Sequence, residues 1–436
     1  MNILPNLLFI SLLTAAVAFA VKNFSRIYAN IHLGRKEDRS GNISERLRLM
    51  ALVSFGQKKM FDRPLPAILH LFVYLGFLIV NIEMLEIVFD GIFGTHRAFA
   101  SLLGSFYPFI INVFEFFAVS VIIACVVFLL RRNVVKVKRF NQSELKKWPF
   151  MDANIILVVE ILLMGAFLKM NSIDQVLSER NFSHYESHGI YMFSSFLMPI
   201  FSSFSSENLE VMERLAWWFH IVGVLIFLNY LPFSKHLHIM LAFPNTYFSK
   251  LNPVGVISNM PEVTKEVKLM LSLPVDESVN YDVKRFGAKD ATDLTQFNLL
   301  NAYTCTECGR CTSVCPANIT GKSLSPRKIM MDTRDRIEEI GRNIEKNDSF
   351  VDDGKSLLGD YITHEEILAC TTCNACVDAC PVNINPLDII VQLRRFKVME
   401  ESQAPQSWNM MFQNMETSMA PWKFSPSDRF NWSDKV

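Results

Sequence analysis

Five long apolar segments in the first half of the chain limit the folds that are open to it. Each is long enough to cross the hydrocarbon core of a bilayer, which takes about 20 apolar residues. Half of all residues are hydrophobic, a share that soluble proteins also reach, so the prediction rests on the length of these runs. The sequence therefore predicts a bundle of transmembrane helices, roughly over residues 3–21, 65–89, 107–130, 151–170 and 215–241.

The first segment ends in Ala18-Phe19-Ala20, which is similar to a signal-peptidase site, but no basic residues precede it. We therefore expect it to be retained as a helix. Basic residues crowd the loops after the first and third segments, whereas the alternate loops contain Arg97 and Arg180 as their only Lys or Arg. Because basic loops stay in the cytoplasm, the N-terminus is predicted outside a bacterial inner membrane and everything after about residue 242 in the cytoplasm.

Beyond residue 242 the sequence becomes more polar and richer in proline and cysteine. Few runs alternate in hydrophobicity as strands do, and residues 335–346 and 367–375 have helical patterns. The sequence therefore predicts an all-α protein, with a five-helix membrane bundle followed by a helical cytoplasmic domain. The expected boundaries are 1–241 for the membrane domain, 242–295 for a linker, 296–398 for the soluble domain and 399–436 for a C-terminal tail.

Eight of the nine cysteines form two runs of identical spacing, each followed by proline: Cys305, Cys308, Cys311 and Cys315, then Cys370, Cys373, Cys376 and Cys380. The spacing C-x2-C-x2-C-x3-C-P is typical of proteins with two [4Fe–4S] clusters, in which the fourth cysteine of each run ligates the other cluster. The predicted ligand sets are Cys305, Cys308, Cys311 and Cys380 for cluster 1, and Cys370, Cys373, Cys376 and Cys315 for cluster 2. A pair of zinc sites is the alternative, although zinc usually combines two C-x2-C pairs.

Histidines inside membrane segments are costly and usually functional. His70 and His238 lie near the cytoplasmic ends of the second and fifth segments, at matching depth, which suits bis-histidine ligation of a haem b between two helices. Buried, hydrogen-bonded histidines without a cofactor are the alternative. If the fifth segment is one continuous helix, His220 and His238 share a face and His236 points away from it. No C-x-x-C-H motif is present, so any haem is non-covalent.

The fifth segment resembles the last helix of the nitrate reductase gamma subunit, a five-helix cytochrome b. The resemblance lies in His220-Ile221-Val222-Gly223 and in Pro232-Phe233-Ser234 before His238. It implies a haem b held by His70 and His238.

The same family has a further histidine on its second helix, where this chain has Val80. One haem is therefore expected, and a possible second haem at His220 would lack its usual partner. His220 is then expected to hydrogen-bond Glu83 or Glu86, and these three residues are the candidate quinone site.

The soluble domain resembles the α-helical ferredoxin of heterodisulfide reductase C-type and succinate dehydrogenase iron–sulfur subunits, because two such cysteine runs flank a long helical segment. Joined to a membrane cytochrome, it resembles a heterodisulfide reductase-like group that includes electron-transfer flavoprotein:quinone oxidoreductases. The resemblance implies electron transfer between a soluble dehydrogenase or electron-transfer flavoprotein and menaquinone or another quinone, through two [4Fe–4S] clusters and haem b.

In that group a cysteine-rich domain with CCG motifs accompanies the two-cluster domain. This sequence contains no CCG motif, and its tail, with Pro421-Trp422 and Phe430-Asn431-Trp432, resembles the segment that joins or docks such a domain. A separate CCG-type subunit is therefore an expected partner. No G-x-G-x-x-G follows a strand pattern, so flavin or nicotinamide is expected on a partner as well. The formal net charge of zero disfavours nucleic acid as a partner.

Two other function classes stay open at this point. A redox-driven ion-translocating complex would need charged residues through the membrane, for which the candidates are Glu83, Glu86, Glu115 and Glu160. The sequence does not show that they form a relay. A redox sensor would need an output domain, and no segment of the sequence has that character.

Overall fold

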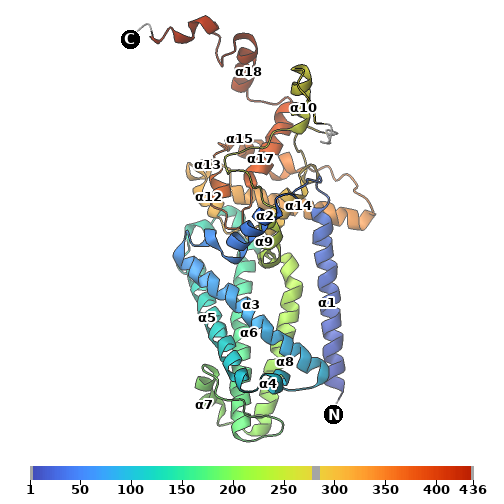
Figure 1. The fold of residues 1–436 in the computed structure, drawn as a ribbon, viewed down its shortest axis with the longest axis vertical. Helices are drawn as coiled ribbons and strands as arrows, with labels where there is room; N and C mark the ends of the chain where they lie inside the picture. The colour runs from blue at the N-terminus through green and yellow to red at the C-terminus, as the bar shows by residue number, and fades with distance from the viewer. Residues whose placement is uncertain (1–2, 277–284, 434–436) are drawn as a thin grey trace.

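The computed structural model describes residues 3–276 and 285–433 (Figure 1). Over these residues the chain is helical and forms no strand, which confirms the predicted all-α class; extended pairing is limited to the isolated bridges Arg35–Thr295 and Leu358–Ile362. A bundle of long helices carries a helical soluble domain on one end, and the N-terminus lies at the opposite end of the bundle (Figure 1).

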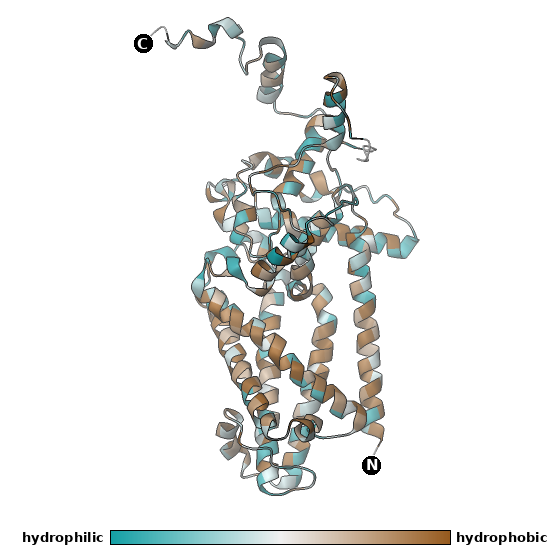
Figure 2. Ribbon diagram, in the orientation of Figure 1, coloured by the Kyte–Doolittle hydropathy of each residue, from teal (hydrophilic) through white to brown (hydrophobic). Residues whose placement is uncertain are grey.

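Within the described residues, five helices are long and apolar enough to cross a membrane, as the sequence predicts. They are α1 (Leu4–Ile31), α3 (Pro64–Phe93), α5 (Tyr107–Asn133), α6 (Trp148–Glu179) and α8 (Ser206–Tyr230). Figure 2 shows these helices as predominantly hydrophobic along their length. α3 packs on α5, α5 on α6 and α6 on α8, while α1 lies against α3 and α8. α1, α3, α5 and α6 carry proline in the first turn, where its missing N–H leaves no hydrogen bond unmade.

Shorter elements connect these spans and lead into the soluble half. They are α2 (Ile43–Met50) with a π-turn over Ala51–Phe55, α4 (Ala98–Leu103), α7 (Met198–Phe201) and α10 (Pro261–Met270). α2 and its π-turn pack on the helix that follows α8, at the end of the bundle nearest the soluble domain.

The membrane segment predicted over 215–241 is not one helix. After α8 the chain makes two 3-10 turns and starts a new helix, in the order Leu231–Phe233, Lys235–Leu237 and α9 (His238–Tyr247). Pro232 has no N–H with which to continue the helix, and Ser234 is extended, with its hydroxyl accepting the His236 N–H at 3.1 Å. His220 and His238 therefore lie on different helices, and the prediction that they share a helix face is wrong.

The soluble domain consists of two similar halves. In each half one helix ends at the first cysteine of a run and another begins with proline after the last cysteine: α11 (Gln296–Thr304) and α14 (Pro326–Asn347), then α15 (His364–Ala369) and α17 (Pro386–Arg395). Short helices lie between them: α12 (Arg310–Val314), α13 (Pro316–Ile319) and α16 (Ala375–Asp378). The predicted helix over 335–346 is confirmed within α14. The one over 367–375 is wrong, because the chain leaves the helix at Cys370 to form a loop.

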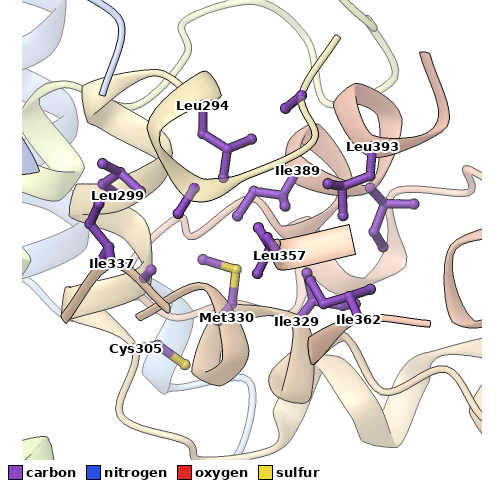
Figure 3. Packing of buried hydrophobic residues seen from close by; sticks show 14 of the residues in the cluster. Leu294, Leu299, Cys305, Ile329, Met330, Ile337, Leu357, Ile362, Ile389 and Leu393 are labelled. Carbon is purple, nitrogen blue, oxygen red and sulfur yellow. The ribbon is translucent and has the colours of Figure 1, made fainter. Parts of the chain in front are cut away.

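The core of the soluble domain lies where α14 packs on α11 and α17. Figure 3 shows Ile329, Met330 and Ile337 of α14 in the same cluster as Ile389 and Leu393 of α17. Beyond this core the chain ends in α18 (Gln406–Ser418) and an extended tail, which project away from the body (Figure 1).

α1 is long enough to reach out of a bilayer and into the soluble domain. Its 28 residues span about 42 Å at ~1.5 Å per residue, against about 30 Å of hydrocarbon. Near its end, Asn30 Nδ2 donates to the Tyr303 hydroxyl of α11 at 2.9 Å, and Gly341 of α14 leaves room for the Asn30 amide. Just beyond α1, the Arg35 N–H donates to the Leu294 carbonyl at 2.7 Å. The soluble domain is thus attached to the first membrane helix as well as to the last.

Arg336 of α14 is fully buried and ties three segments of the soluble domain together. Its guanidinium donates to the Asp290 carboxylate at 2.7 and 2.9 Å, to the Asp353 carboxylate at 2.5 and 3.0 Å, and to the Lys355 carbonyl at 2.9 Å. Two carboxylates are therefore neutralised by one cation that has no access to water.

Replacing Arg336 by alanine should lower the free energy of unfolding of the soluble domain by about 3 kcal/mol, because Asp290 and Asp353 would keep their charge without a partner. The measurement is chemical denaturation of the detergent-solubilised chain. Arg342→Ala, which removes an exposed arginine from the same helix, is the matched control. Equal stability of the two variants would contradict the assignment.

Candidate metal centres

The two cysteine loops repeat one backbone conformation. Two residues in each loop have left-handed φ angles: Glu307 (56°) and Gly309 (69°) in the first, Thr372 (55°) and Asn374 (61°) in the second. Turns of this kind gather backbone N–H groups around an anion, as they do at many iron–sulfur sites. Glycine and asparagine tolerate such angles better than other residues, which accounts for their place after the second cysteine of each run.

The fold brings the last cysteine of the second run to the loop of the first. A single cavity is lined by thiols from both runs: Cys305, Cys308, Cys311, Cys376 and Cys380. The electrostatic neighbours of Cys370 and Cys376 include Cys315 and Cys373. The crossing follows from the packing of α12 on α16, the short helices that leave the two loops. We use cage 1 for Cys305, Cys308, Cys311 and Cys380, and cage 2 for Cys370, Cys373, Cys376 and Cys315.

The thiols of cage 1 are buried and repel one another when ionised. Burial, with a contribution from the other thiolates, raises the pKa of Cys305 to about 12 and that of Cys380 to about 11. The Ile384 N–H donates to Cys380 Sγ at 3.2 Å, and in cage 2 the Thr372 N–H donates to Cys370 Sγ at 3.4 Å. Soft thiolate donors that share a cavity and accept amide N–H groups are the donor chemistry of iron–sulfur clusters, so the residues present fit such a group.

Cage 1 faces the membrane bundle and is tied to it by buried charges. Glu307, between two cage 1 cysteines, accepts from Lys235 Nζ at 2.8 Å and pairs with Arg334 of α14 at 3.0 Å. Although burial opposes ionisation, Lys235 and Arg334 hold the pKa of Glu307 below its usual range. The contact is therefore fully formed at neutral pH and weakens as the pH falls through that lowered pKa. Arg310 adds a hydrogen bond to the Lys59 carbonyl at 3.0 Å.

His70 of α3 and His238 of α9 come together at the end of the bundle beneath cage 1. Their ring centres lie 6.4 Å apart at an interplanar angle of 42°. Two imidazoles that bind one metal ion from opposite sides stand about 6 Å apart at their centres, since each metal–nitrogen bond is about 2 Å. The spacing of this pair therefore fits axial ligation of a haem iron.

Hydrogen bonds fix which nitrogen of each ring is free to bind a metal. His70 Nδ1 lies 3.1 Å from Gln57 Oε1, and His238 Nδ1 lies 2.9 Å from the Lys235 carbonyl. Both acceptors are oxygens, so both Nδ1 atoms carry the proton and both Nε2 atoms keep a lone pair. Metal-bound histidines typically have such a partner on the second nitrogen.

The surroundings of His236 and His220 differ from the expectation. His236 does not point away: its ring centre lies 5.7 Å from that of His238, because both residues sit at the helix break rather than on one helix. His220 is buried, but its Nδ1 donates to the Leu163 carbonyl of α6 at 2.9 Å, so the predicted bond to Glu83 or Glu86 is wrong. Gly223 accounts for this contact, because without a Cβ it lets α8 approach Leu163 closely.

A buried polar network occupies the outer half of the bundle. Arg97 donates to Asp174 at 2.9 Å and to Asn171 at 2.6 Å, and its guanidinium lies 3.8 Å from Glu83. Both Glu83 carboxyl oxygens are buried and have no hydrogen-bond partner in the described part of the chain. Sequence reasoning missed the roles of Arg97 and Asp174, although the single basic residue of its loop was a signal for Arg97.

Two further carboxylates belong to the same network. The Tyr107 hydroxyl donates to Glu86 at 2.9 Å, and Asn171 Nδ2 donates to Glu115 at 3.0 Å. Three of the four acidic candidates are thus linked through Arg97 and its partners. Glu160 is elsewhere, near Cys125.

Comparison with known proteins bears on the cysteine cages first. Residues 304–384 match the family model described as 4Fe-4S dicluster domain. This part of the chain is a 4Fe-4S dicluster domain. The match supports iron–sulfur clusters over the zinc alternative.

Over its whole length the chain is similar to longer iron–sulfur oxidoreductases. It is 28% identical to the probable iron-sulfur-binding oxidoreductase FadF of Bacillus subtilis, over 99% of this chain and 61% of that protein. It is also 28% identical to the EtfAB:quinone oxidoreductase of Syntrophomonas wolfei, over 91% of this chain and 55% of that protein. The chain therefore spans little more than half the length of these relatives.

The dicluster domain has a relative of its own. Over 24% of this chain, it is 33% identical to the C-type subunit of the ferredoxin/F(420)H(2)-dependent CoB-CoM heterodisulfide reductase of Methanosarcina acetivorans, which it covers to 53%. No solved structure gives a significant match. The resemblance to heterodisulfide reductase-like iron–sulfur oxidoreductases is confirmed.

The crossed cages make a specific prediction for Cys380. Anaerobically purified protein should contain about eight iron ions per chain, and Cys380→Ala should lose about half of them, from the cluster that the other three cage 1 thiols bind. Iron and acid-labile sulfide are measured together. Cys125→Ala, at a buried thiol outside both cages, should keep full iron content. Loss of the cage 2 cluster alone in Cys380→Ala would overturn the crossing.

Proposed function

We propose that this chain is the membrane electron-transfer component of an oxidoreductase that links a soluble dehydrogenase or electron-transfer flavoprotein with menaquinone or another quinone. The observation that carries the proposal is the contact between cage 1 and the histidine pair. Lys235 pairs with Glu307 of the cage 1 loop at 2.8 Å, and the carbonyl of the same lysine accepts the His238 Nδ1–H. The similarity to an EtfAB:quinone oxidoreductase supports the proposal.

Bound in the cages and between the histidines, two [4Fe–4S] clusters and haem b supply the one-electron redox chemistry. The residues of this chain set their order. Cys373 brings cage 2 to the surface of the soluble domain, cage 1 lies against the bundle, and His70 and His238 lie within it. This order favours a path between a soluble partner at cage 2 and a quinone in the membrane.

The soluble partner is proposed to carry a CCG-type cysteine domain. α18 and the tail after it stand away from the body, and several of their large apolar side chains are exposed, among them Met410, Met415, Trp422 and Phe424. Such side chains on a projecting segment suit a protein contact. The basic loops favour an orientation with the soluble domain in the cytoplasm of a bacterium and the N-terminus outside the inner membrane.

The quinone site is proposed in the outer half of the bundle, with Glu83, Glu86 and His220 as its candidate residues. Glu83 is a buried carboxyl without a hydrogen-bond partner in the described residues, beside the Arg97 guanidinium. A carboxyl in this setting can exchange a proton with a bound quinone. About 20 Å of α3 separates Glu83 from His70, so a second haem at His220 would shorten the electron path.

A second candidate function, ion translocation driven by the redox reaction, gains support from the same network. Arg97 and its partners connect Glu83, Glu86 and Glu115, which is the kind of linked set that a proton path requires. Proton movement that persists when quinone reaction is blocked would favour this function.

The histidine pair gives the sharpest test of the haem. His70→Ala and His238→Ala should each abolish a low-spin b-type spectrum, because each removes an imidazole whose Nδ1 is fixed and whose Nε2 is free. His236→Ala should retain the spectrum, since the ring of His236 has no such fixed orientation. Loss of the haem in His236→Ala, with the spectrum kept in His238→Ala, would reverse the assignment.

Glu83→Gln should lower quinone-linked turnover at least tenfold while haem content stays unchanged, because the amide cannot exchange the proton. Glu179→Gln, an exposed position at the end of α6, is the matched control and should keep full turnover. His220→Ala is assayed beside them: loss of half the haem would show a second haem. Unchanged turnover in Glu83→Gln would remove this residue from the quinone site.

A further inference from the structure

A cavity of about 370 Å³ opens where the membrane bundle meets the soluble domain. Its walls come from three parts of the chain: α2 with the turn after it, linker residues 249–256, and the soluble domain at α11 and the start of α17. Neither the cysteine cages nor the histidine pair lines it with their metal-binding side chains. The cavity therefore belongs to the joint between the two halves of the molecule.

The lining of this cavity carries an excess of positive charge. Its charged side chains are four basic ones against two acidic ones: Arg39, Arg48, Lys59 and Lys250, against Glu45 and Asp388. Lys250 pairs with Asp388 at 2.7 Å, and Arg39 pairs with Glu37. Over the described residues, the side chains of Arg48 and Lys59 have neither a hydrogen bond nor an ion pair. The two remaining cations are thus available to an anion, and side-chain amides such as Asn301 and Asn383 add donors.

Apolar side chains border the same cavity on the side of the membrane bundle. Leu52, Val254 and Val256 line it and are 43%, 47% and 50% exposed, and Phe55 nearby is 52% exposed. This border lies a few residues before Pro64, where α3 enters the bundle. A cationic cavity with an exposed apolar border at this level matches an anion that carries hydrocarbon chains.

We propose that the cavity binds the phosphate headgroup of an acidic phospholipid from the leaflet that faces the soluble domain. This rests on the proposed placement of the bundle in a membrane. Arg48 and Lys59 bind the phosphate, and the acyl chains lie along Leu52 and Phe55. The lipid then joins α2 to the soluble domain beside cage 1, since the Lys59 carbonyl accepts from Arg310 of the cage 1 loop.

The test measures lipid retention by the full chain with its natural partners. The complex is washed in detergent, and the phospholipids that remain bound are identified by mass spectrometry. The native complex should retain phosphatidylglycerol or cardiolipin in preference to phosphatidylethanolamine. The double variant R48Q/K59Q should bind phosphatidylglycerol roughly 30-fold more weakly. K322Q/K346Q removes the same charge from exposed positions outside the cavity and should retain lipid like the native protein.

Two probes distinguish the sources of the phosphate. Vesicles of phosphatidylglycerol should raise the thermal unfolding midpoint of the delipidated complex, and inorganic phosphate alone should not. Equal lipid retention by R48Q/K59Q and K322Q/K346Q would overturn the proposal, and so would equal stabilisation by inorganic phosphate. Retention is read without electron donor or quinone, so failure of the proposed electron transfer would leave this result standing.

Discussion

The charge of Lys235 holds the two halves of the molecule in register. Its ammonium is mostly buried and donates to Glu307 of the cage 1 loop at 2.8 Å and to the Pro149 carbonyl at the start of α6 at 2.6 Å. Its own N–H donates to Asp152, and its carbonyl accepts from His238. One residue therefore contacts the soluble domain, a membrane helix and a candidate haem ligand.

Burial makes this arrangement strict. Charges removed from water are stabilised only when their partners stay close and well aligned, and removal of one partner leaves the others buried and unpaired. Lys235 can occupy this position because the chain breaks its helix at Pro232 and continues through two 3-10 turns. On an uninterrupted helix its carbonyl would bond within the helix, and His238 would lose the acceptor that orients its ring.

Much of this molecule could be predicted from patterns that act locally. Membrane helices follow from the length of apolar runs, and the dicluster domain follows from cysteine spacing, since both depend on residues that are neighbours in the sequence. The pairing of His70 with His238 came from matching depth in two helices, and their rings do lie together.

What could not be predicted depends on contacts between distant segments. His220 turns to the Leu163 carbonyl because Gly223 lets two helices approach, and no sequence period encodes that distance. Arg97 joins carboxylates from three helices, which only the packing brings together. The helical pattern over 367–375 was overruled at Cys370, where the left-handed residues of a cysteine loop replace the helix.

The length of α1 also has a consequence for the membrane that this protein can occupy. Because Asn30 is fixed to Tyr303 of the soluble domain, α1 acts as a strut that sets the height of that domain above the hydrocarbon. In a thicker bilayer the strut would have to stand more upright or the lipid would have to thin around it, at a cost of a fraction of a kcal/mol per Å. Bilayer thickness is thereby coupled, through hydrophobic mismatch, to the spacing between the cysteine cages and the membrane surface.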